Sequence, residues 1–177
     1  MKRPFAATNI VIHNDNIYVP TRIEIQTGTG FGLNVKPITI IPFNKIEELH
    51  QTIPELIEAG QPEIVEDPLD TDGDAMLRAT EIPSWQEFYT QIQGLWVLSI
   101  MLGRDVFTIE ETGRKQSAYH RLPPPEIGAT LTIEEAKQIS PDLFEEPYTE
   151  AFAPGTPVET VVARLIELIR AHATETA

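Results

Sequence analysis

Four acidic residues in the middle of the chain have the types and the spacing of a site for a hard cation. Asp70, Asp72 and Asp74 occupy alternate positions, and Glu81 stands at the twelfth place counted from Asp70. A hard divalent cation takes six to eight oxygen ligands, and alternate carboxylates converge on it while a distal glutamate closes the site with both oxygens. The sequence DTDGDAMLRATE over 70–81 therefore predicts a calcium site.

These twelve residues resemble the calcium loop of EF-hand proteins, and that resemblance implies calcium as the ligand. The chain departs from the family at Ala75, where an EF-hand has glycine in a sharp turn that favours a left-handed backbone. Pro68 and Pro83 stand on either side, and they argue against the two flanking helices of an EF-hand. An unliganded acidic loop over about 61–83 is the alternative, and we favour it. No other cofactor is expected.

The distribution of charge predicts a basic protein as partner. The chain has 27 acidic and 13 basic residues, for a net charge of −14. Such a charge repels nucleic acid and anionic membranes, so neither is expected as a partner. Within residues 63–74 there are six acids and no base, and Trp85 follows, with a solvated loop as the alternative interpretation. The predicted partner-binding residues are Glu63, Glu66, Asp67, Asp70, Asp72, Asp74 and Trp85.

No catalytic motif is evident in the sequence. The chain has no cysteine, and its four histidines stand far apart without the spacing of a metal site. Glu110 and Glu111 are adjacent on an expected strand, so they point to opposite faces and do not share a proton as a catalytic pair would. A hydrolase or lyase site assembled from scattered residues stays open as a hypothesis, although no catalytic residue is predicted.

The pattern of apolar residues predicts one α+β domain over 1–177. It contains antiparallel strands in hairpin and meander groups, short helices and a longer C-terminal helix. Asn and Asp supply the turn of the first hairpin, and Pro37 favours an edge position for a later strand. Ser84, and Thr132 together with Glu135, are expected to cap short helices, and Thr156 with Pro157 starts the last one. One apolar stripe is expected along that last helix, formed by Val158, Val161, Val162, Leu165, Ile166 and Ile169. The expected strands are 10–12, 17–19, 22–26, 34–41, 94–102, 106–109 and 117–122.

Two stretches, 84–111 and 152–169, are similar in style to immunity proteins of bacterial contact-dependent growth inhibition systems. The resemblance implies one-to-one binding that blocks a toxin domain, often a basic nuclease. The N-terminal sequence lacks the apolar run of a signal peptide, and no apolar stretch approaches the roughly 20 residues of a membrane span, so a cytoplasmic location is expected. The sequence thus leads to a protein-binding protein, with a calcium-binding module and an enzyme as alternatives.

Overall fold

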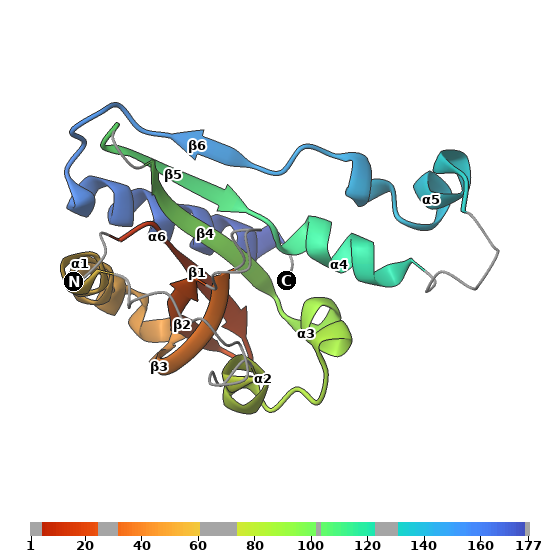
Figure 1. Ribbon diagram of the computed structural model, residues 1–177, viewed down its shortest axis with the longest axis horizontal. Helices are drawn as coiled ribbons and strands as arrows, with labels where there is room; N and C mark the ends of the chain where they lie inside the picture. Colours follow the sequence, from red (N-terminus) through yellow and green to blue (C-terminus); the bar gives the residue numbers. More distant parts are fainter. Residues whose placement is uncertain (1–4, 25–31, 61–73, 102–103, 123–130, 176–177) are drawn as a thin grey trace.

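The computed structural model describes residues 5–24, 32–60, 74–101, 104–122 and 131–175. One six-stranded antiparallel sheet runs through the molecule in the order β3-β2-β1-β4-β5-β6 (Figure 1). The strands are β1 (Ala7–His13), β2 (Asn16–Glu24), β3 (Gly32–Pro42), β4 (Gly94–Met101), β5 (Val106–Glu111) and β6 (Thr149–Ala151). The helices are η1 (Phe43–Glu48), α1 (Leu49–Ala59), α2 (Ala75–Thr80), α3 (Trp85–Gln91), α4 (Gly113–Arg121), α5 (Ile133–Ile139), η3 (Pro141–Phe144) and α6 (Val158–Glu175). The predicted α+β class is confirmed.

The first hairpin and the edge strand form as the turn and proline signals predict. Asn14 and Asp15 both have positive φ, at 47° and 57°, which is the backbone that a two-residue hairpin turn requires. This turn pairs Ile12 with Ile17 in the antiparallel register of β1 and β2. β3 lies at the edge of the sheet, where Pro37 removes no hydrogen bond from an inner ladder.

Alternation along the strands gives the sheet two apolar faces. Ile10 and Ile12 face α1 and α6, whereas Val11 faces α2 and α3. The apolar stripe predicted for the C-terminal helix is confirmed. It is buried against the first face through Val161, Val162, Leu165, Ile166 and Ile169. No helix in the described part of the chain is both long enough and apolar enough to cross a membrane.

Two local predictions are wrong. The strand expected over 117–122 belongs to α4, whose first turn holds Arg114, Lys115 and Gln116, straight-chain residues that favour a helix. The sheet takes its sixth strand from β6 instead. The acidic loop expected over 61–83 contains α2, which folds because its Met76 is buried in the core of the α2 and α3 face. Residues 61–73 lie outside the described ranges.

Candidate functional site

Two adjoining hollows form one cleft between the start of α4, the region of η3 and the C-terminal half of α6. Their volumes are about 250 Å³ and 160 Å³, and they share four lining residues, Glu111, Arg114, Asp142 and His172. We call this combined space the cleft. It brings together carboxylates, a guanidinium and an imidazole from three separate parts of the chain.

Aromatic rings form the floor of the cleft. Trp96 on β4 is 3% exposed, and its ring meets those of Tyr148 and His172 edge to face, at centroid distances of 6.2 Å and 6.0 Å. His172 is also buried, and its Nε2 lies 3.2 Å from the carbonyl oxygen of Gln93. The buried indole N–H of Trp96 has no hydrogen-bond partner among the described atoms, so the floor keeps one unpaired donor.

The start of α4 holds the carboxylate of Glu111 in place. Glu111 is 6% exposed, and its Oε1 accepts a hydrogen bond of 3.3 Å from the backbone N–H of Arg114. The N-terminus of a helix also favours a negative charge. The neighbouring Gly113 has no room for a side chain without a shift of its surroundings, because a Cβ there would lie 2.8 Å from that oxygen and 2.9 Å from the backbone nitrogen of Leu95. The carboxylate is therefore fixed by the backbone around it.

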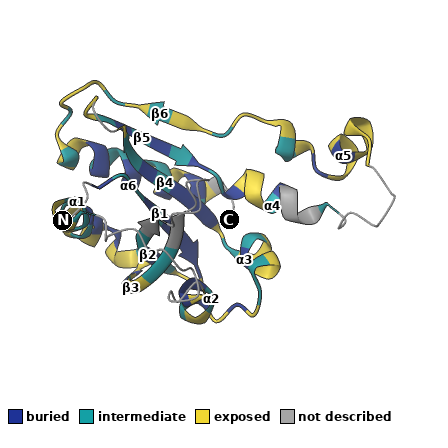
Figure 2. Ribbon diagram, viewed as in Figure 1, coloured by how far each residue is buried: buried dark blue, intermediate teal, exposed yellow. Residues whose placement is uncertain are grey.

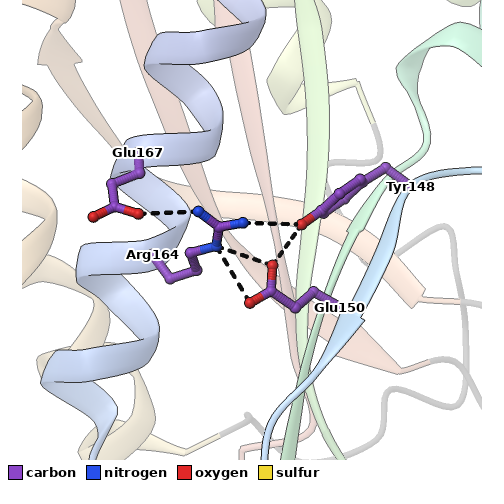
Figure 3. Close-up of polar contacts among 4 residues, drawn as sticks. All are labelled: Tyr148, Glu150, Arg164 and Glu167. Carbon is purple, nitrogen blue, oxygen red and sulfur yellow. Dashed lines mark hydrogen bonds and ion pairs between the residues drawn. The ribbon is translucent and has the colours of Figure 1, made fainter.

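A polar network fixes the position of Tyr148 in the floor of the cleft (Figure 3). The hydroxyl of Tyr148 donates to Glu150, and Arg164 on α6 donates to both oxygens of Glu150 and to Glu167. The hydrogen bond from Tyr148 lowers the pKa of Glu150 below its usual value. The same bond raises the pKa of Tyr148. The network ties β6 to α6, so the position of Tyr148 is set by both elements.

Residues 131–148 project beyond the sheet at the end of the molecule opposite α1, and we call them the arm (Figure 1). The arm contains α5 and η3. It is attached to α4 through Ser140, whose buried hydroxyl donates to the carbonyl of Ala118 at 2.8 Å. The capping box predicted for Thr132 and Glu135 is confirmed at the start of α5. These contacts give the arm a defined position even though most of its side chains are exposed (Figure 2).

The arm concentrates exposed apolar side chains. Of the seven exposed large hydrophobic residues in the described ranges, the two outside the arm are Ile40 and Met101. The five on the arm are Leu131 (43% exposed), Ile133 (61%), Ile139 (44%), Phe144 (45%) and Tyr148 (43%). Five carboxylates and one amine accompany them, so the arm has a net charge of −4. The acidic members are Glu134, Glu135, Asp142, Glu145 and Glu146, and the amine belongs to Lys137.

The structure brings together two of the residues that the sequence predicts for partner binding. The indole N–H of Trp85, at the start of the predicted short helix α3, donates to Asp74 Oδ1 at 3.1 Å. The other five, Glu63, Glu66, Asp67, Asp70 and Asp72, lie outside the described residues.

The two described members of the predicted calcium site stand at opposite ends of α2. Asp74 precedes the helix and Glu81 follows it in a left-handed conformation with φ 59°. The six residues of α2 separate their backbones by roughly 10 Å along the helix. Among the described residues no group of three His, Cys, Asp or Glu is placed to hold a metal. Calcium binding stays a prediction, since Asp70 and Asp72 are not described.

The cleft escapes prediction from the sequence because its residues are far apart along the chain. Glu111 and His172 come from β5 and α6, and only the packing of α6 on the sheet makes them neighbours. One signal for the arm is present in the sequence, since the stretch from Leu131 to Tyr148 interleaves apolar residues with acids.

Comparison of the chain with models of protein families, with characterised proteins and with solved structures finds no match. The fold and the site therefore define the class by themselves: an α+β protein with an acidic, apolar arm beside a charged cleft.

Proposed function

We propose that this chain is an acidic cytoplasmic protein that binds and neutralises a basic protein partner, in the manner of a toxin-immunity protein. One observation carries the proposal. The arm gathers five exposed large apolar side chains and five carboxylates in eighteen residues. The rest of the described surface exposes only Ile40 and Met101 in this way.

Side chains of this kind suit an interface. Protein interfaces have an apolar core that favours aromatic residues and a polar rim, and a contiguous exposed apolar patch marks an interaction site. On the arm, Ile133 and Phe144 supply apolar area, and Glu134 and Glu145 follow them directly in the sequence. Carboxylates attract a basic partner and speed the encounter, and they repel a second copy of a chain with a net charge of −14. The arm is thus suited to a partner of opposite charge.

Asp74 and Trp85, two of the predicted partner-binding residues, add a second part to the proposed binding surface. The side chain of Trp85 on α3 is hydrogen-bonded to Asp74, and α3 packs on α4, to which the arm is attached. The resemblance of two stretches of the sequence to immunity proteins favours a toxin domain as the partner. A basic nuclease would have the charge opposite to that of this chain.

Photo-crosslinking from the arm tests the proposal. A photoreactive residue is placed at 133 on the arm and, in a matched control, at 40 on β3, where an isoleucine is also exposed, by 50%. We expect position 133 to capture a basic protein in cells and position 40 to leave it uncaptured. The captured protein, produced alone, should arrest growth, and coexpression of the intact chain should restore growth. Capture from both positions alike, or capture of an acidic protein, would contradict the proposal.

A further inference from the structure

The cleft opens at the C-terminal part of the arm, from Asp142 to Tyr148, which we call its root. The proposed docking surface therefore continues into a hollow. Asp142, Glu145, Glu146 and Tyr148 belong to the arm and also line the larger hollow. A partner seated on the arm therefore places its own side chains over the cleft. What the cleft accepts follows from its size, its charge and its aromatic floor.

Each of the two hollows in the cleft has a size that suits one side chain. Pockets for drug-sized ligands measure roughly 300–1,000 Å³. The larger hollow is about 250 Å³, and the smaller one is about 160 Å³. A single long side chain entering from the arm fits these volumes better than a large cofactor does.

The charge of the cleft favours a cation. Its lining has four carboxylates, on Glu111, Asp142, Glu145 and Glu146, against the two cationic side chains of Arg114 and Lys115. Glu111 is the deepest of the four at 6% exposure, and its position is fixed by the start of α4. A buried carboxylate beside a hollow gains most from a partner that brings both positive charge and hydrogen-bond donors.

The aromatic floor distinguishes arginine from lysine. The rings of Trp96 and Tyr148 line the larger hollow. A guanidinium is planar, stacks on aromatic faces and presents a fork of donors to a carboxylate, whereas an ammonium is a compact and strongly hydrated point charge. Arginine is also among the residues most enriched at the energetic centres of interfaces.

We propose that the cleft is an anchor pocket that takes an arginine side chain of the partner, with the guanidinium directed to Glu111 and packed against Trp96 and Tyr148. This inference rests on the proposed function, because the arginine arrives on a protein docked at the arm. It adds a specific requirement to that function. The partner must present an arginine at the root of the arm, and its loss should weaken binding more than the loss of an arginine at the rim.

A titration with arginine itself tests the pocket without the partner. The probe is N-acetyl-arginine amide, added to the ¹⁵N-labelled full chain at constant ionic strength while the two indole N–H signals are followed. Trp96→Phe assigns the signal. We expect a saturable shift of the Trp96 indole with a dissociation constant on the order of millimolar, since one side chain makes few contacts. N-acetyl-citrulline amide, which is neutral and of the same shape, should produce no shift.

Two isosteric variants on neighbouring residues of β5 provide the control. Glu111→Gln keeps an acceptor for the N–H of Arg114 but removes the charge from the cleft. Glu110→Gln removes the same charge on the opposite face of the strand, where Glu110 pairs with Val97 rather than Trp96. The arginine shift should disappear in the first variant and persist in the second. An equal shift of the Trp96 indole signal with the citrulline probe, or an arginine-induced shift unchanged by Glu111→Gln, would refute the anchor pocket.

The docking arm and the anchor pocket can be refuted independently. Ile133→Asp should weaken binding of the partner and leave the arginine titration unchanged. If Ile133→Asp weakens partner binding while Glu111→Gln does not, the docking arm is supported and the anchor pocket is refuted. If the arginine titration succeeds while Ile133→Asp leaves partner binding unchanged, the pocket binds arginine but the arm is not the docking surface. If both the docking arm and the anchor pocket are correct, Glu111→Gln should weaken binding of the partner by roughly tenfold or more.

Discussion

Replacing Ile133 on the arm by alanine should barely change the stability of the fold. Ile133 is 61% exposed, so 39% of its surface is covered. Full burial of an isoleucine side chain is worth about 1.5–3 kcal/mol, and the covered share therefore contributes about 1 kcal/mol or less. Alanine also has the higher helix propensity, which offsets part of this loss at the first residue of α5. The expected net change in the free energy of unfolding is below about 1 kcal/mol.

Leu165 on α6 is the reference for this measurement. It is 0% exposed in the core between α6 and the sheet. Truncation of such a residue leaves a cavity, and Leu165→Ala should lower the free energy of unfolding by about 2–5 kcal/mol. Urea unfolding followed by tryptophan fluorescence gives both values, and equal slopes against denaturant establish that the same transition is compared.

The comparison between these two variants decides what the exposed isoleucine is for. A side chain that folding does not need, on an arm crowded with similar ones, is available for a partner. If Ile133→Ala destabilises the chain as much as Leu165→Ala does, then Ile133 is part of the fold and the exposed apolar surface of the arm loses its significance. A small loss of stability together with weakened partner binding is the result that the proposed function requires.

Three further predictions address the cleft, the polar network of Glu150 and the predicted calcium site. Gly113→Ala should lower the free energy of unfolding by about 1–3 kcal/mol in the same urea assay, because the new Cβ would lie 2.9 Å from a backbone nitrogen; an unchanged value would contradict this crowding. Glu150→Gln should lower the melting temperature at pH 7. The difference in melting temperature from the unaltered chain should shrink as the pH falls below about 4.3, the pKa of a glutamate in the unfolded chain, and then through the lowered pKa of Glu150 in the folded chain. A difference in melting temperature that does not depend on pH would show that ionised Glu150 is not the form that stabilises the fold. Millimolar calcium should leave the melting temperature unchanged, because Asp74 and Glu81 stand at opposite ends of α2; a rise that Asp70→Ala abolishes would instead establish the metal site.

The sequence predicts those elements whose signals are local. The hairpin turn at Asn14 and Asp15 needs only two residues that tolerate positive φ. The cap at Thr132 and the stripe of α6 likewise depend on residues within a few turns of one another. Pro37 marks an edge strand because the missing N–H would break an inner ladder. Each of these predictions holds because the physical cause lies within a short segment.

The sequence fails where tertiary contacts decide. Thr112 and Gly113 look like a turn between strands, but the carboxylate of Glu111 and the carbonyl of Thr112 accept the first N–H groups of a helix. Residues 75–80 fall within the loop predicted over 61–83, yet burial of Met76 makes them helical. The cleft joins residues from β5, η3 and α6, and no pattern along the chain indicates that these three meet.

The affinity of the captured partner for two aspartate variants tests the central claim most directly. Ile133→Asp and Ile40→Asp add the same charge at exposed isoleucines, one on the arm and one on β3. By titration calorimetry at physiological salt, Ile133→Asp should weaken binding by roughly tenfold or more, as for a buried apolar contact, and Ile40→Asp by far less. Equal dissociation constants for the two variants would contradict the claim that the partner docks on the arm.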